Sequence, residues 1–405
     1  MNYILQRGIS AGIIYISTIY IAEKLGVEEF GAVAFLLFLT KFMHISNLGS
    51  ASGYIYQTYN NSNDIRESYT VLYFSHLVLV SVLLLAIVLT VCWNKSCSDN
   101  LYHWPIIFFF IQIPLYAIEP WSRVKRRFYI SLLPELLLVT SLAASVYIAS
   151  EYDTKDLNSV FVMTLAIFIL QVGLFLVTHV KGSTAFKLEM PAYTGRALKD
   201  YVGLLRSGFP LYIGTMLFLI FLLIDRYFIR NYHSEELLGV YMMAFNFSFA
   251  SSLIIGSLNF INAINIGESL KSGTFDMKRM KNNLKYLIVS GALLYIVIIA
   301  IAYAAEKTIL DGYSNLTAQV AILSIGFICF YVSGNISPIL FFSGKQYLLT
   351  RALIAMLGVS FFSNIMFVVL KLPGEYIAGV TSLLLVLYSG YSLLCSFNYS
   401  DYKGK

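Results

Sequence analysis

The sequence predicts an all-α integral membrane protein, with about 12 transmembrane helices in two six-helix bundles and both termini cytoplasmic. Its composition is the first of three observations behind this prediction. The 405-residue chain is 58% hydrophobic and 12% charged, with a mean hydropathy of +0.73. Because a soluble domain carries roughly 25% charged residues, this chain has about half the usual charge.

Long apolar runs are the second observation. Crossing a bilayer as a helix takes about 20 apolar residues, and runs near that length recur along the chain. Twelve candidate spans lie near residues 4–22, 31–55, 69–91, 102–122, 128–149, 158–180, 208–230, 239–266, 285–305, 316–342, 350–370 and 375–396. Gly334 and Pro338 predict a kink in the tenth span. An even number of spans places both termini on one side.

The distribution of basic residues is the third observation. If the N-terminus is inside, the cytoplasmic connections and the two termini together hold 20 of the 28 Lys and Arg residues. The connections on the outer side hold only 5. Cytoplasmic loops of membrane proteins carry such an excess of Lys and Arg. This asymmetry predicts that both termini are cytoplasmic.

The longest polar segment, 181–207, divides the chain into two halves. The predicted domains are an N-terminal six-helix bundle at 1–180, a cytoplasmic linker at 181–207, and a C-terminal six-helix bundle with a short cytoplasmic tail at 208–405. A weak similarity between "LGVEEFGAVAF" and "YHSEELLGVYMM" places Gly31 and Gly239 in matching positions. Parallel repeats of this kind are a common transporter plan, in which two bundles rock around a central cavity.

Charged residues within the spans are candidate functional residues, because charge inside the bilayer is costly. Lys41 lies deep in the second span, with His44 one turn along, and is predicted to line a cavity or to pair with a carboxylate of another span. Arg7 lies on a polar stripe of the first span and could face the cavity or reach the interface. Glu135 is expected to pair with the basic cluster at 123–127.

Asp225, Arg226 and Arg230 form a third charged group, at the end of the seventh span. The side chains of Asp225 and Arg226 should diverge because adjacent residues on a helix do not face each other. Arg226 and Arg230 share a helix face and should repel unless an anion or a carboxylate lies between them. We expect this group either to gate the outer rim of a cavity or to anchor the helix structurally.

Asn259, Asn262 and Asn265 recur every three residues in the eighth span. Polar side chains of this kind form hydrogen bonds between membrane helices. The same amides could line a cavity wall suited to sugar hydroxyls. Both interpretations remain open at this point.

Motifs of enzymes and energy-coupling domains are absent from the sequence. It has no Walker A loop, no HExxH, no GxSxG and no clustered acidic metal site. The four cysteines, which include Cys92 and Cys97, show neither metal-binding nor redox spacing. We expect a transporter without a cofactor and with no nucleic-acid partner, driven by an ion gradient, the membrane potential or a downhill substrate.

Two stretches resemble Wzx-type O-antigen flippases, in the polysaccharide-transport branch of the MOP exporter superfamily. The first is "LGVEEFGAVAFLLF", preceded in the first span by Arg7-Gly8. The second is "SGFPLYIGTMLFLIFLLIDRYFIRNYHSEELLGVYMMAF". Its matching residues are Gly208, Pro210, Asp225, Arg226, Leu238, Gly239 and Tyr241. One departure is Asn47 in "SNLGSASG", where the family often has Asp.

The resemblance implies a MATE-like fold in a bacterial inner membrane. It also implies transport of an oligosaccharide repeat unit, of O-antigen or capsule, from the cytoplasmic to the outer leaflet. The carrier would be undecaprenyl pyrophosphate, and a polysaccharide polymerase and a chain-length regulator would be expected partners. Arg7 and Lys41 are cations that suit a pyrophosphate.

Three other functions compete with this one. A multidrug or cation exporter of the MATE branch would favour acidic residues where this chain has basic ones. A polysaccharide polymerase or glycosyltransferase would need a substantial outer loop, whereas the outer loops here are short. A scaffold in an assembly complex would have no reason to bury Lys41.

Overall fold

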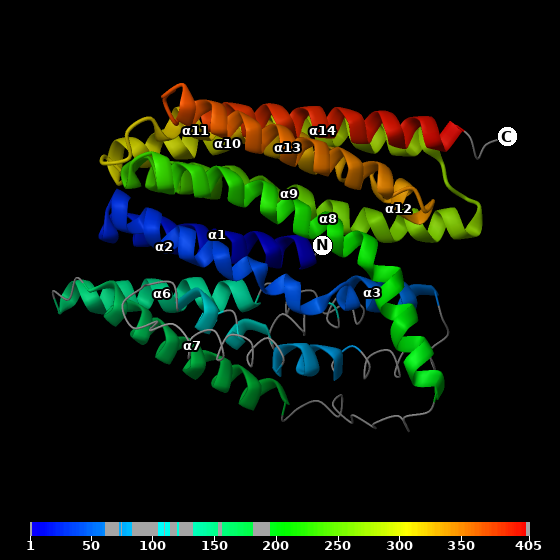
Figure 1. Ribbon diagram of the computed structural model, residues 1–405, viewed down its shortest axis with the longest axis horizontal. Helices are drawn as coiled ribbons and strands as arrows, with labels where there is room; N and C mark the ends of the chain where they lie inside the picture. Colours follow the sequence, from blue (N-terminus) through cyan, green and yellow to red (C-terminus); the bar gives the residue numbers. More distant parts are fainter. Residues whose placement is uncertain are drawn as a thin grey trace. The chain divides into compact units, whose positions relative to one another are not determined.

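The computed structural model describes residues 2–60, 73, 75–82, 104–108, 110–113, 120, 133–152, 156–180 and 195–401, which are almost entirely helical (Figure 1). Its helices are α1 Asn2–Leu25, α2 Val27–Thr40, the 3-10 helix η1 Lys41–Asn47, α3 Ser50–Asn60, α6 Leu133–Glu151, α7 Leu157–Val180, α8 Gly195–Tyr232, α9 Glu235–Ser272, α10 Met277–Thr308, α11 Leu316–Ser333, α12 Pro338–Phe342, α13 Tyr347–Val369 and α14 Tyr376–Asp401. Among the described residues, 7 helical stretches are long and apolar enough to cross a bilayer. The chain is therefore a multi-pass membrane protein, while the count of twelve spans and the side of the termini stay predictions.

Most predicted spans in the described part of the chain have a matching helix. The spans predicted near 128–149, 158–180, 285–305, 350–370 and 375–396 correspond to α6, α7, α10, α13 and α14. Helices α8 and α9 are longer than predicted, at 38 residues each. Because α8 begins at Gly195, the second part of the segment predicted as a linker at 181–207 is helical. The spans predicted near 69–91 and 102–122 lie largely outside the described residues.

The span predicted at 31–55 is broken rather than continuous. Leu48 and Gly49 have φ angles of 43° and 91°, and Asn47 Oδ1 accepts a hydrogen bond from the backbone N–H of Gly49 at 2.8 Å. Residues in the left-handed conformation cannot continue a right-handed helix. The single span is therefore corrected to two helices, α2 and α3, joined through η1.

A second break lies where the kink was predicted in the tenth span. Helix α11 ends at Ser333 and α12 begins at Pro338. Proline is tolerated in the first turn of a helix, where its missing N–H leaves no bond unmade. The residues between the two helices remain in turns, since the backbone N–H of Asn335 bonds to Val332 O at 3.2 Å.

The chain divides into two compact units. The first unit comprises Met1–Tyr15, Leu25–Phe35 and Leu217–Lys405, and the second comprises Ile16–Lys24 and Leu36–Met216. This division differs from the predicted boundaries at 1–180, 181–207 and 208–405, because α1, α2 and α8 each contribute residues to both units. The two six-helix bundles stay a prediction.

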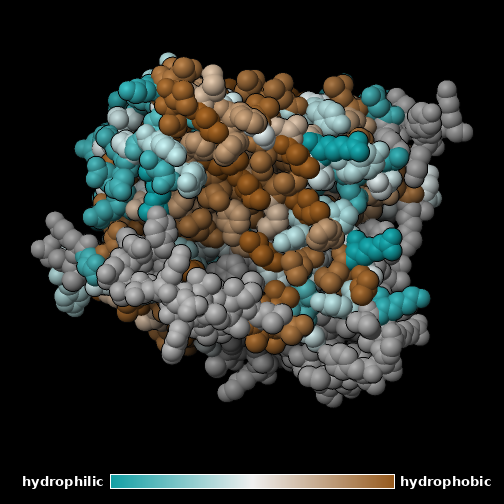
Figure 2. Space-filling model, in the orientation of Figure 1, coloured by the Kyte–Doolittle hydropathy of each residue, from teal (hydrophilic) through white to brown (hydrophobic). Residues whose placement is uncertain are grey.

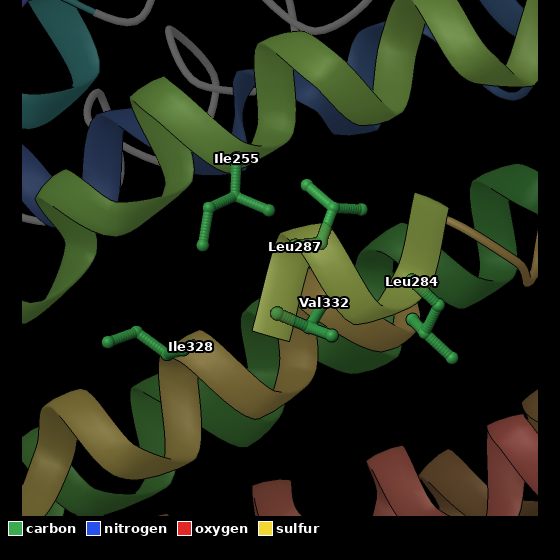
Figure 3. Close-up of a cluster of buried hydrophobic side chains, with 5 residues drawn as sticks. All are labelled: Ile255, Leu284, Leu287, Ile328 and Val332. Carbon is green, nitrogen blue, oxygen red and sulfur yellow. The ribbon is translucent and has the colours of Figure 1, made fainter. Parts of the chain in front are cut away.

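Helix α11 forms the centre of the first unit. It packs against α9, α10 and α14. A cluster of five buried apolar side chains joins α9, α10 and α11 (Figure 3), and its members are Ile255, Leu284, Leu287, Ile328 and Val332. Gly291 of α10 permits this close packing, because a Cβ there would lie 2.8 Å from Ile328 Cγ2.

The surface of the helices is apolar in a band between two polar ends (Figure 2). Helix α10 contributes to the apolar exposed surface with Leu293 at 61% and Ile296 at 62% exposure. A soluble protein rarely exposes large contiguous apolar patches. This surface is the one expected to contact lipid.

Candidate functional site

Asp225 and Arg226 lie inside the first unit and not at its surface. Both side chains are 0% exposed, on the apolar part of α8 that is long enough to cross a bilayer. Ionisable residues inside a membrane are costly, and they often mark substrate and ion pathways. The candidate site is therefore centred on Asp225.

Three neighbouring helices surround the Asp225 carboxylate with hydrogen-bond donors. Tyr241 of α9 donates its hydroxyl to Oδ2 at 2.9 Å, and Thr381 of α14 donates to the same oxygen. Ser360 and Asn364 of α13 donate to Oδ1 at 3.3 and 3.2 Å. We call these five residues the Asp225 cluster. It joins α8, α9, α13 and α14 of the first unit.

Helical spacing explains why α13 and α14 can contribute to this cluster. Ser360 and Asn364 are four residues apart, so they lie on one face of α13. Both are buried, at 0% and 1% exposure. Thr381 is buried on α14, and its hydroxyl also lies 3.0 Å from the carbonyl oxygen of Ile377. Because a hydroxyl has one proton, Thr381 can donate to Asp225 or to Ile377.

The oxygens of the Asp225 cluster suit a proton or a small monovalent cation. The carboxylate oxygens of Asp225 lie next to the hydroxyl oxygens of Ser360 and Thr381. Hard cations prefer oxygen ligands, and a single carboxylate balances one positive charge. Among the described residues, no group of three His, Cys, Asp or Glu side chains could hold a metal ion.

Arg226 lies over aromatic rings of α9. Its guanidinium lies 3.9 Å from the ring centroid of Phe245 and 5.7 Å from that of Tyr241, both on α9. Its Nη1 donates to the carbonyl oxygen of Leu222. An arginine over an aromatic face gains a cation–π attraction that strengthens when water is excluded.

Arg230 lies over a ring of a different helix. Its guanidinium is 4.7 Å from the ring centroid of Phe35 in α2. The sequence predicted that Arg226 and Arg230 would repel unless an anion or a carboxylate lay between them. The structure places the Arg226 guanidinium over a ring of α9 and the Arg230 guanidinium over a ring of α2, and the predicted repulsion stays a prediction. Whether the three charged residues gate or anchor stays open.

Lys41 pairs with Glu135 in the second unit. Lys41 Nζ lies 3.6 Å from Glu135 Oε1, and the two side chains are 33% and 37% exposed. This contact is the alternative predicted for Lys41, a carboxylate from another span. The basic cluster at 123–127, expected to contact Glu135, lies outside the described residues, as do the side chains of Arg7 and His44.

The asparagines of α9 form hydrogen bonds with the break between α11 and α12. Asn259 Nδ2 donates to Tyr331 O at 2.5 Å, and Asn335 Nδ2 donates to Asn259 Oδ1 at 3.1 Å. Asn262 Nδ2 donates to Asn335 Oδ1 at 2.8 Å. These contacts favour a helix–helix role for Asn259 and Asn262, whereas Asn265 is exposed. Sugar binding by the three amides stays a prediction.

Sequence reasoning named Asp225 but missed three partners of its carboxylate. Ser360, Asn364 and Thr381 are polar residues within apolar runs, "LGVSFFSNIMF" and "AGVTSLLL". Such residues could have been found by treating uncharged polar residues in the spans in the same way as Lys41. Tyr241 did belong to the resemblance motif, although no partner was predicted for it.

Solved structures that are similar to this chain include membrane transporters. No family model and no curated protein sequence matches the chain. An inward-facing multidrug resistance MATE family transporter of the MOP superfamily matches with a TM-score of 0.64 and 13% identity, over 98% of this chain and 96% of that chain. The lipid II flippase MurJ, in an inward closed conformation, matches with a TM-score of 0.59 and 13% identity, over 97% and 87% of the two chains.

A third match is a MOP superfamily transporter from Pyrococcus furiosus. Its TM-score is 0.58 at 14% identity, over 100% of this chain and 96% of that chain. At such identities the similarity concerns the fold alone, and it extends along the whole chain. The protein therefore has the fold of the MOP superfamily transporters.

Proposed function

We propose that the protein is a flippase for an oligosaccharide linked to undecaprenyl pyrophosphate. It would move an O-antigen or capsule repeat unit from the cytoplasmic to the outer leaflet of a bacterial inner membrane by alternating access. A polymerase and a chain-length regulator would receive the repeat unit at the outer face. The protein would act as a transporter and not as an enzyme.

The observation that carries the transport part of this proposal is the Asp225 cluster. A carboxylate with 0% exposure in a membrane helix is costly to keep, and hydrophobic packing alone does not require it. Its neutral donors allow it to release or take up a proton or a monovalent cation without breaking an ion pair. An ion gradient could drive transport through this change.

The substrate part of the proposal rests on the sequence resemblance and on Lys41. A pyrophosphate group requires cationic partners. The Lys41–Glu135 pair is partly exposed, at 33% and 37%, and partly exposed pairs contribute little to stability. We propose that the substrate's pyrophosphate replaces Glu135 as the partner of Lys41 during transport.

A multidrug exporter is the second candidate function. The MATE family transporter matches with a TM-score of 0.64, against 0.59 for MurJ. Such an exporter would use acidic groups to bind cationic drugs, and Asp225 is one such group. Because the carboxylate oxygens of Asp225 already accept four side-chain hydrogen bonds, we assign it to ion coupling and not to drug binding.

Deletion of the gene in its host tests the proposal. A flippase predicts accumulation of a complete repeat unit on its lipid carrier, together with loss of surface polysaccharide. Intact polysaccharide with altered drug sensitivity would favour the multidrug exporter. Single repeat units that reach the surface without chain extension would indicate a polymerase and contradict the flippase.

A further inference from the structure

The first turns of α9 are packed on every side. All eight residues from Leu238 to Phe245 are buried. Successive helix residues point about 100° apart, so eight buried residues in a row mean that neighbours cover the whole circumference. A shift of these turns must therefore be accommodated by the helices on both sides.

One face of these turns touches α2, backbone against backbone. A Cβ on Gly31 would lie 2.7 Å from the backbone nitrogen of Gly239, and a Cβ on Gly239 would overlap the carbonyl oxygen of Val27. We call this contact the α2–α9 crossing. One turn beyond Gly31, the ring centroid of Phe35 lies 4.7 Å from the Arg230 guanidinium. Small residues allow helix backbones to approach this closely in membranes.

The opposite face of the same turns touches the Asp225 cluster. Tyr241 follows Gly239 by two residues and so points about 200° away around the helix. Its hydroxyl donates to Asp225 Oδ2 at 2.9 Å, and its ring faces the Arg226 guanidinium at 5.7 Å. Helix α9 therefore lies between the carboxylate and α2.

We infer that Tyr241 is a positioning residue that couples the occupancy of Asp225 to the α2–α9 crossing. This inference rests on the ion coupling in the proposed function. With a free carboxylate, the Tyr241 hydroxyl holds the start of α9 toward α8. A proton or a sodium ion on Asp225 takes up the acceptor capacity of Oδ2 and releases Tyr241. The start of α9 can then shift, and the crossing, which tolerates little displacement, opens.

Few charged or titratable groups contact Asp225 among the described residues. Among its contacts in the described residues, the charged or titratable groups are Arg226 of its own helix and Tyr241 of α9. Helices α13 and α14 present the neutral side chains of Ser360, Asn364 and Thr381. Of these neighbours, Tyr241 is the residue that lies on the helix of the crossing.

Thiol labelling of the crossing tests the inference. Ala34 shares the helix face of Gly31 and is 7% exposed, so Ala34→Cys should be protected while the crossing is closed. The four native cysteines are first replaced by serine, and the full-length protein is placed in lipid nanodiscs. A hydrophilic maleimide then reports the labelling rate in NaCl and in choline chloride, each at pH 7.5 and pH 5.5. Glu29→Cys, at an exposed position of α2, is the matched control.

The expected result is a labelling rate at Ala34→Cys that rises at least about fivefold with Na⁺ or at pH 5.5, within the usual range of coupling between sites. Comparison of the two salts at one pH shows whether a sodium ion or a proton causes the rise in the labelling rate. Tyr241→Phe keeps the ring beneath Arg226 but should abolish most of this rise. Glu29→Cys should label at one rate throughout.

Gly239→Ala provides a second test from the other side of the helix. It separates the crossing directly, so it should hold Ala34→Cys at the fast rate in every buffer while Na⁺ or acid still stabilises the protein. A full response in Tyr241→Phe, or no response in the parent protein, would overturn the inference. The gene-deletion experiment is independent of this one. If lipid-linked repeat units accumulate after deletion, the proposed function stands even where the labelling result overturns the role of Tyr241.

Discussion

Asp225 of α8 and Glu135 of α6 are both carboxylates on helices, and the protein holds them in different ways. Asp225 is 0% exposed and accepts four hydrogen bonds from neutral side chains. Glu135 is 37% exposed and meets one lysine at 3.6 Å. Asp225 has no salt bridge to break within the described residues when it takes up a proton or a cation, whereas Glu135 must separate from Lys41 to change its partner. The first arrangement suits a change of protonation or ion occupancy, and the second suits exchange of partners.

Removal of the buried carboxylate is expected to have the largest effect. Asp225→Ala leaves four donors without their acceptor and Arg226 without the adjacent negative charge. The free energy of unfolding should fall by about 3 kcal/mol, as when one partner is removed from a buried charged network, and transport should be lost. Thermal unfolding in detergent measures the stability. Asp311→Ala, at an exposed position, is the control, and an equal loss there would contradict the role of burial.

Loss of one neutral ligand should have a smaller and more specific effect. Thr381→Val keeps the shape of the side chain and removes its hydroxyl, at a cost of about 1 kcal/mol for one hydrogen bond. A bound ion stabilises the folded state, so the unfolding temperature of the parent protein should rise with Na⁺ or with acid. This rise should weaken in Thr381→Val. The control is Ser389→Ala. Among the described residues, the Ser389 hydroxyl donates only to Leu385 O of its own helix α14, so this variant should keep the full response.

The exposed pair should separate transport from stability. Lys41→Ala should change the free energy of unfolding by less than about 1 kcal/mol, because partly exposed ion pairs contribute little, yet it should reduce transport severely. The exchange Lys41→Glu with Glu135→Lys rebuilds the pair in reverse. If Lys41 binds the pyrophosphate, the exchange restores stability and not transport. Recovery of surface polysaccharide in the doubly exchanged protein would remove Lys41 from the substrate site.

The sequence predicted the helices better than their contacts. Spans such as 285–305 follow directly from hydropathy, which depends on the residues of one segment. The break at Leu48 and Gly49 was missed although small and polar residues, "SNLGSASG", surround it, and the backbone there is left-handed. The hydrogen-bond partners of a buried polar side chain, in contrast, can come from several helices. Asp225 was therefore found as an isolated charge, and its partners on α13 and α14 could not be assigned to it.

The pair Gly31 and Gly239 shows what an internal sequence similarity can and cannot predict. The two glycines were noted as equivalent positions of a weak internal similarity. The structure brings them into contact, with 2.7 Å between a Cβ on Gly31 and the Gly239 nitrogen. Sequence equivalence could not predict this contact, because repeated positions need not meet. Small residues at both positions were nevertheless a requirement of such a close crossing.

A third carboxylate, outside the membrane, should have the smallest effect. Asp156 precedes α7 and accepts hydrogen bonds from the Ser159 hydroxyl at 3.0 Å and from the backbone N–H groups of Asn158 and Ser159. These bonds lower the pKa of Asp156, with the Ser159 hydroxyl as the largest cause. Because the folded pKa is the lower one, the stabilisation is present above the unfolded pKa, about 3.9, and is lost as the pH falls through the folded pKa.

Asp156→Ala should accordingly lower the unfolding temperature slightly at pH 7, by less than Asp225→Ala does. The difference from the parent protein should shrink as the pH falls below about 4, where the carboxylate becomes protonated. Thermal unfolding across a pH series measures both effects. If Asp156→Ala were as destabilising as Asp225→Ala, the number of hydrogen bonds to a carboxylate, and not its burial among neutral donors, would set its importance in this protein.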